Sequence, residues 1–99
     1  NVSIFAENLW NTIANPNNYY KFKADNYTGH EGAFNWSTSI TTFTQMPNSS
    51  NEGVVLSQFN FDTGKNKSEI DIYAQLPNGE GAGTRTSMVT FTSRLAEGY

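Results

Sequence analysis

The chain contains no cysteine, and this absence excludes several kinds of protein. Without cysteine there can be no disulfide framework, no thiolate metal site and no thiol nucleophile. The single histidine, His30, likewise rules out a metal site built from several histidines. We therefore expect this protein to hold no metal and no cofactor.

Charge is also scarce, because Asp, Glu, Lys and Arg make up 15% of the residues, against roughly 25% in typical soluble domains. The net charge is −3, and the lysines include only two close pairs, Lys21/Lys23 and Lys65/Lys67. A nucleic-acid partner requires a basic stripe that displaces phosphate counterions, so we expect none. No apolar run approaches the length of a membrane span, so we expect no membrane insertion.

Uncharged polar residues take the place of the missing charge, with thirteen Asn, nine Ser and eleven Thr among 99 residues. Aromatic residues reach 14%, which argues against disorder. A chain of this length predicts a single domain spanning residues 1–99. Because it begins at Asn1 instead of Met, we expect a processed chain or a fragment of a longer one.

The segment 2–14 has a helical pattern, since its apolar residues recur at spacings of three and four. Asn1 or Ser3 is a suitable N-cap, and Asn15-Pro16 is a typical end. The stripe predicts an amphipathic N-terminal helix and consists of Val2, Phe5, Ala6, Leu9, Trp10 and Ile13.

From Tyr19 onward the apolar period changes to two, which predicts strands. About five strands follow from this alternation, over residues 19–26, 33–44, 54–61, 69–76 and 84–93. In the segment 69–76 the inward face carries Ile70, Ile72, Ala74 and Leu76, and Tyr73 points outward.

The connections between these strands are too short for helical crossovers, so the strands should be antiparallel. We expect an α+β, mostly β fold, in which the helix over about residues 2–14 packs on an antiparallel sheet of about five strands in meander order. A β-sandwich or small barrel with a docked helix is the alternative.

Three patterns that suggest catalysis or phosphate binding are better explained structurally. Asp62-Thr63-Gly64 is similar to the triplet of aspartic proteases, but it lies between two strands and predicts a turn. The glycine-rich segment 79–86 lacks the lysine and the following helix of a phosphate-binding loop. Glu69 and Asp71 share a solvated strand face, where no burial raises a pKa for acid catalysis. We therefore expect no catalytic residue and a non-enzymatic protein.

Exposed aromatics and loop charges are the candidates for contact with a ligand or partner. Tyr73 stands among hydrogen-bonding groups on an outward face, which suits a protein interface or a sugar. The glycine-rich loop is a candidate contact arm. The predicted contact residues are Tyr73, Trp36, Tyr27, His30, Glu80 and Arg85.

These observations favour a non-enzymatic structural or binding module, extracellular or on a virion, fibre or pilus-like particle. It would act through exposed aromatics, loops and sheet edges, with a protein partner or a second copy favoured over a small molecule, and a glycan possible. Five Asn-X-Ser/Thr sites lend weak support to secretion, at Asn1, Asn26, Asn35, Asn48 and Asn66.

Two other functions remain open. The first is a ligand-binding or enzymatic pocket between the helix and a curved sheet, lined by Trp10, Tyr20, Trp36 and His30. The second is an inhibitor or anti-host factor that docks on one protein through the loops 45–53 and 77–83.

Overall fold

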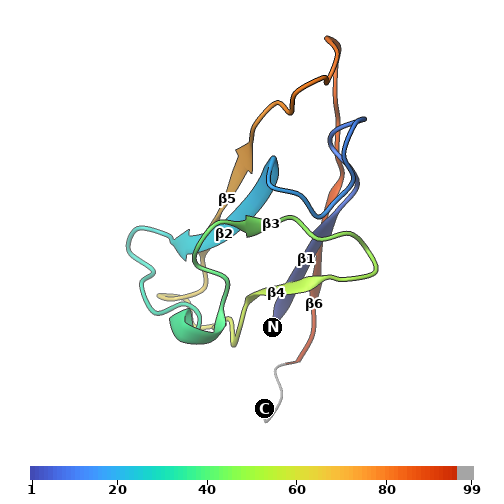
Figure 1. The fold of residues 1–99 in the computed structure, drawn as a ribbon. Helices are drawn as coiled ribbons and strands as arrows, with labels where there is room; N and C mark the ends of the chain where they lie inside the picture. Colours follow the sequence, from blue (N-terminus) through green and yellow to red (C-terminus); the bar gives the residue numbers. More distant parts are fainter. Residues whose placement is uncertain (96–99) are drawn as a thin grey trace.

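A computed structural model describes residues 1–95 of the chain, and within them two three-stranded antiparallel sheets face each other (Figure 1). One sheet has the strand order β4-β1-β6 and the other the order β3-β2-β5. The elements are β1 (Val2–Ala6), β2 (Tyr20–Asn26), the 3₁₀ helix η1 (Trp36–Thr38), β3 (Thr44–Gln45), β4 (Gly53–Leu56), β5 (Ser68–Ala74) and β6 (Val89–Ser93).

The predicted N-terminal helix is wrong, because its first residues form β1 instead. β1 is the central strand of its sheet and pairs antiparallel with both β4 and β6. Since both the meander and its alternative required that helix, the predicted fold class is wrong. The fold is nearly all β in the described residues, where η1 is the one helical turn.

Asparagine side chains explain why residues 7–19 need no helix. The side-chain amide of Asn15 donates to the carbonyls of Ala6 and Glu7, at 3.1 and 2.9 Å. The backbone N–H of Asn15 donates in turn to Oδ1 of Asn8 at 2.8 Å. Such side chains satisfy backbone groups locally and so compete with helix formation.

The antiparallel pairing of strands is confirmed, although the meander order is not. The predicted strands 19–26 and 69–76 correspond to β2 and β5, which pair with each other along seven residues. β5 ends at Ala74, so Leu76, predicted to face inward, lies beyond the strand and is exposed. The segment 33–44 forms η1 instead of a strand; there the Asn35 carbonyl accepts hydrogen bonds from the Thr38 amide and the Ser39 hydroxyl. The other two predicted strands are shorter in the structure, as β4 and β6.

The core lies between the two sheets. Alternation places Ile4 of β1 and Phe22 of β2 on the inner faces, where both are fully buried together with Met46 and Val55. The cluster also contains Ala6, Tyr20, Ala24, Ala33, Phe34 and Leu56.

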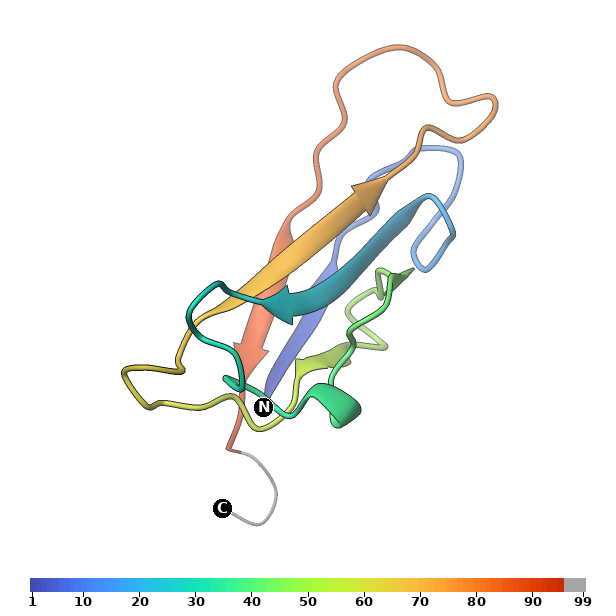
Figure 2. The same cartoon turned by 90° about the vertical axis from the view of Figure 1, so that its left-hand side faces the viewer.

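One side of the sandwich is closed by the segment 40–47, which bridges the two sheets through backbone hydrogen bonds. The Ala24 amide donates to the Ile40 carbonyl at 2.7 Å, and the Ile40 amide donates to Val55 at 3.2 Å. The Ala6 amide donates to Pro47 at 2.9 Å. Strands β3 and β4 lie on this closed side (Figure 2).

The opposite side has no such bridge in the described residues. β5 pairs there with β2 alone, and β6 with β1 alone. Figure 2 shows β5 and β6 together on the side of the sandwich away from β3 and β4. We call this side the open margin and define it by Ile70, Ile72, Val89 and Phe91, the inward-facing apolar residues of the two edge strands.

Candidate contact surfaces

The open margin exposes apolar side chains that the strand alternation directs toward the core. Ile72 pairs with Phe22 across β5 and β2, and Phe91 pairs with Ile4 across β6 and β1. Phe22 and Ile4 are fully buried, but Ile72 is 49% exposed and Phe91 is 51% exposed. Because no further strand covers the two edges in residues 1–95, half of each side chain meets solvent.

The edge of β6 lacks the sequence features that usually prevent an exposed strand from pairing with another chain. Natural edge strands carry charges, proline or bulges, which discourage pairing with another chain. The sequence of β6 is Val-Thr-Phe-Thr-Ser, with no charge and no proline, and its pairing with β1 is regular over all five residues. β5 carries charge only on its outward face, at Glu69 and Asp71. The open margin is therefore suited to strand addition.

A second surface lies on the outer face of the β3-β2-β5 sheet; we call it the aromatic–lysine patch and define it by Lys21, Lys23, Phe43 and Tyr73. The Phe43 and Tyr73 rings are 5.7 Å apart. The Lys21 ammonium lies 5.4 Å from the Tyr73 ring centre, and that of Lys23 lies 5.2 Å from Phe43. The patch is thus aromatic and cationic, and its lysines partly cover the ring faces.

Three carboxylates approach one another beside this patch, and they are the described residues best placed to hold a cation. Ligand atoms of Asp25, Glu69 and Asp71 lie within 4.8 Å of one another. A hydrogen bond with Asp71 and repulsion from its charge raise the pKa of Glu69. The Lys23 ammonium already lies 3.7 Å from Asp25 and 3.8 Å from Asp71, so it supplies positive charge to the cluster.

Of the residues predicted to make contacts, Tyr27 and His30 are neighbours in the loop after β2. Their rings meet edge to face at 5.7 Å, and Lys67 lies 5.5 Å from the Tyr27 ring centre. The Asn66 amide donates to Nδ1 of His30 at 3.2 Å, which ties this loop to the one before β5.

Trp36 and Tyr73 lie in other surroundings. Trp36 begins η1, is 47% exposed and stacks on Phe34 at 5.9 Å. Tyr73 points outward as predicted and belongs to the aromatic–lysine patch, where its hydroxyl donates to Gln75 at 2.7 Å. The predicted contact residues thus form no single site, and their roles stay predictions.

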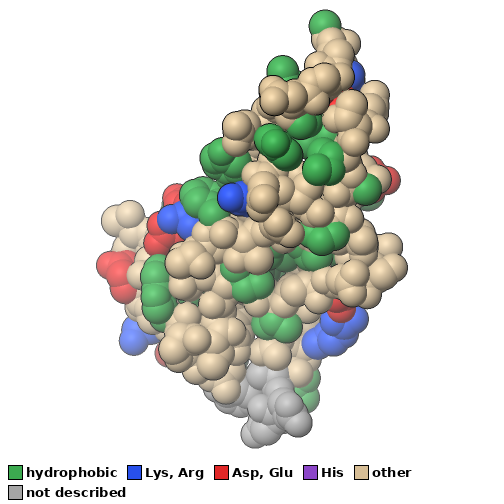
Figure 3. Space-filling model, viewed as in Figure 1, with side chains coloured by type: hydrophobic (Ala, Val, Ile, Leu, Met, Phe, Trp, Pro, Cys, Tyr) green, Lys and Arg blue, Asp and Glu red, His purple; other side chains and the backbone are tan. Residues whose placement is uncertain are grey.

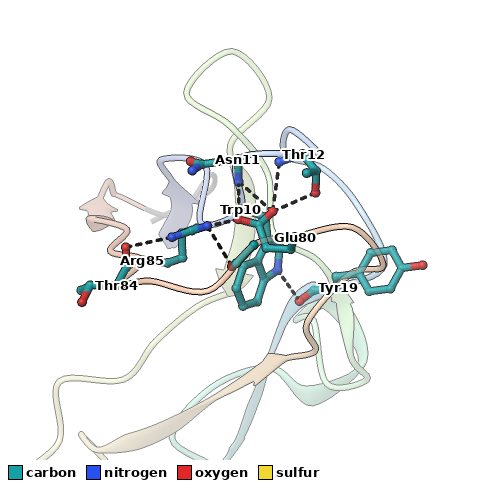
Figure 4. Close-up of polar contacts among 8 residues, drawn as sticks. Trp10, Asn11, Thr12, Tyr19, Glu80, Thr84 and Arg85 are labelled. Atoms are coloured by element: carbon teal, nitrogen blue, oxygen red, sulfur yellow. Dashed lines mark hydrogen bonds and ion pairs between the residues drawn. The ribbon is translucent and has the colours of Figure 1, made fainter.

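Glu80 and Arg85 form an ion pair whose side chains are largely buried (Figure 4). Pro77 to Glu80 form a turn, with Gly79 at φ +81° and the Glu80 amide donating to Pro77 at 3.3 Å. This turn presents the Glu80 side chain, which is fully buried, to Nε of Arg85 at 2.5 Å.

The same carboxylate accepts hydrogen bonds from the loop after β1. The amides of Asn11 and Thr12 donate to Oε1 of Glu80 at 3.1 and 3.0 Å, and the Thr12 hydroxyl donates at 2.8 Å. Burial alone would raise the pKa of Glu80, but the hydrogen bonds from Arg85, Thr12 and Asn11 outweigh it and lower that pKa to about 2. The loop that we expected to be a contact arm is therefore anchored at Glu80.

The helix-covered pocket considered above has no counterpart, because the helix is absent. Tyr20, one of its expected lining residues, is in the core, with its hydroxyl 3.0 Å from that of Ser87. A separate surface hollow of about 400 Å³ lies beside Phe59, Phe61 and Leu95. In the part of the chain that the structure describes, no helix has the length and apolar character needed to cross a bilayer.

Comparison with protein-family models, curated proteins and solved structures found no match to this chain. Any functional inference therefore depends on the surfaces described above.

Sequence reasoning missed Ile72 and Phe91, the most exposed members of the open margin. Both are inward-facing in the strand pattern, and nothing in the local sequence distinguishes an inward residue of a central strand from one of an edge strand. Phe43 is also missing from the predicted contact residues; its place out of phase in the segment 33–44 suggests a bulge and is the one signal that sets it apart.

Proposed function

We propose that the chain is a non-enzymatic binding module that recognises a protein partner through its open margin. The observation that carries the proposal is the half exposure of Ile72 and Phe91 on two edge strands, each of which has one neighbouring strand within residues 1–95. Recognition of this kind adds an extended segment to a sheet edge, so that main-chain hydrogen bonds give affinity and alternate side chains give specificity.

The rest of the surface supports a structural or binding role more than a catalytic one. Figure 3 shows a face on which backbone and side chains that are neither hydrophobic nor charged predominate, between scattered apolar and charged side chains. Glu80 and Arg85 form an ion pair with each other, so neither side chain is free to act as a catalytic group. The five Asn-X-Ser/Thr sequences support an extracellular or particle-bound setting for this module, and the uncharged polar composition is compatible with it.

The proposal can be tested by NMR titration of the isotope-labelled protein with a strand-forming peptide of alternating valine and threonine. We expect amide shift changes concentrated in β5 and β6, because among the described strands only these edges offer both unpaired backbone and exposed inward side chains. The control is a peptide of the same length with proline at alternate positions, which cannot form the hydrogen-bond ladder. Equal shifts with both peptides, or shifts centred on β3 and β4, would contradict the proposal.

Glycan binding at the aromatic–lysine patch is a second candidate function. Next to Tyr73 of the patch lie the carboxylate of Asp71 and the amide of Gln75, groups that suit sugar hydroxyls. The test is a glycan array with the wild-type protein and Tyr73→Ala, with Tyr27→Ala as the control. Binding that survives Tyr73→Ala would remove this candidate.

A further inference from the structure

We infer that the partner at the open margin is a second copy of this chain, joined by two-fold symmetry. This inference rests on the proposed function and names its partner.

The arrangement of the edges is self-complementary. A two-fold axis perpendicular to a sheet brings an edge strand antiparallel to its own copy, with the same face of the sheet inward. Because β5 and β6 lie at the same side of two facing sheets, one such axis pairs β5 with β5 and β6 with β6. The contact is then closed, with the same surface used by both copies, which is the commonest symmetry of soluble oligomers.

The charges on β5 are compatible with one register of this pairing. An axis beside Ile72 places Asp71 opposite Tyr73 of the second copy and Glu69 opposite Gln75, so no carboxylate faces another. An axis one residue away, beside Asp71, would instead oppose two aspartates, which is unfavourable. β6 carries no charge, so an axis beside Phe91 sets only Thr, Val, Ser and Phe against one another.

Both registers centre on residues that pair with the core. Ile72 is the partner of Phe22 and Phe91 is the partner of Ile4, and both of these partners belong to the one buried cluster. The inferred dimer requires Ile72 and Phe91 to lie near the same level of the sandwich, so that a single axis passes beside both. In the dimer they would extend the core from one copy to the other.

The contact can bury both side chains and backbone. Ile72 and Phe91 each leave about half of their surface exposed in the single copy. Pairing also buries backbone and flanking side chains along the seven residues of β5 and the five of β6. A specific complex buries ~800 Å² per partner, so the contact needs both edge strands and not one alone.

Sedimentation equilibrium over a wide range of concentrations tests the inference on the full chain. We expect a monomer–dimer equilibrium whose dissociation constant rises at least about tenfold in Phe91→Lys and in Ile72→Lys, because each places a charge in the contact. The control is Val54→Lys on β4, the opposite edge of the same sheet as β6, which should leave the dissociation constant unchanged. Circular dichroism checks that each variant is folded.

Cross-linking gives a second measurement that needs no disruptive charge. Directly opposed residues of an antiparallel pair have Cα atoms about 4.5–5.5 Å apart, within the range of a disulfide. Since the chain has no cysteine of its own, Phe91→Cys and Ile72→Cys should each give a disulfide-linked dimer on mild oxidation. Phe61→Cys, at a side chain 94% exposed outside the margin, is the control and should cross-link far less.

The outcomes separate the inference from the proposed function. A chain that stays monomeric at every concentration overturns the second copy as partner, while the peptide titration still decides whether the margin accepts a strand. A dimer that Phe91→Lys and Ile72→Lys do not weaken, with no preferential cross-linking, overturns the inference and places the contact elsewhere.

Discussion

Glu80 is a single residue that holds together two loops distant in sequence. Its carboxylate joins the loop after β1, through Asn11 and Thr12, to the loop before β6, through Arg85. A buried carboxylate is tolerated when it is paired and hydrogen-bonded, and the contacts of Glu80 meet both conditions. The sequence showed only a charged residue among glycines, so its burial could not be predicted.

We predict that Glu80→Gln destabilises the protein in a pH-dependent manner. The pKa of Glu80 in the folded protein, about 2, is below its ordinary value of 4.5. Ionised Glu80 therefore stabilises the fold fully above pH 4.5, and this contribution is lost as the pH falls toward about 2. Thermal unfolding followed by circular dichroism should show melting temperatures for wild type and variant that differ by several degrees at neutral pH and converge in acid.

Glu69→Gln is the matched control for this experiment. Asp71 raises the pKa of Glu69, so removing the charge of Glu69 should not destabilise the protein at neutral pH. A difference between wild type and Glu80→Gln that stays constant across the acid range would show that the ionised carboxylate of Glu80 is not the stabilising species.

At the scale of the element, β1 is where the local pattern and the structure disagree most. Val2, Phe5 and Ala6 fit a helical stripe, but Val2, Ile4 and Ala6 fit a strand equally well. The choice is made by pairing with β4 and β6, which lie about 50 and 90 residues away in the chain. No local pattern contains that information.

We predict that Ser3→Pro unfolds or severely destabilises the protein. Ser3 is buried in the central strand, between Val54 and Thr92, where proline removes a donor from the hydrogen-bond ladder. In the first turn of a helix the same substitution would be tolerated. The measurement is urea unfolding, with Ser49→Pro as the control.

Ser49 follows Asn48 in a turn closed by the Asn51 amide at 3.1 Å, a position that favours proline. Ser49→Pro should therefore leave the unfolding midpoint nearly unchanged. Equal stability of the two proline variants would contradict the assignment of β1 as a central strand.

By contrast, β2 and β5 could be predicted from the sequence because each alternates cleanly and each is the other's main partner. Tyr20, Phe22 and Ala24 face the core as expected from their alternation with lysines. The open margin could not be predicted in the same way. Whether Ile72 is covered depends on which strand lies beyond β5, and that is a property of the sheet order.

At the scale of the whole molecule, dimerisation should protect backbone amides at the open margin and leave those at the closed side unaffected. We predict that hydrogen exchange of the β5 and β6 amides slows as protein concentration rises, because their free edges become paired in the dimer. Exchange in β3 and β4, on the closed side, should not depend on concentration. Mass spectrometry of peptides from each strand measures this, and concentration-independent exchange in β5 and β6 would contradict it.

The sheet order β4-β1-β6 also constrains how the chain can fold during its synthesis. β1 is made first of the six strands, yet its two neighbours follow only after β2 and β3, and β6 is made last. The sheet β3-β2-β5 can be complete on the ribosome while β1 has β4 beside it but still lacks β6, its second neighbour. During that interval an apolar strand must wait in an unfinished sandwich, which gives chaperones and neighbouring chains their best opportunity to bind it.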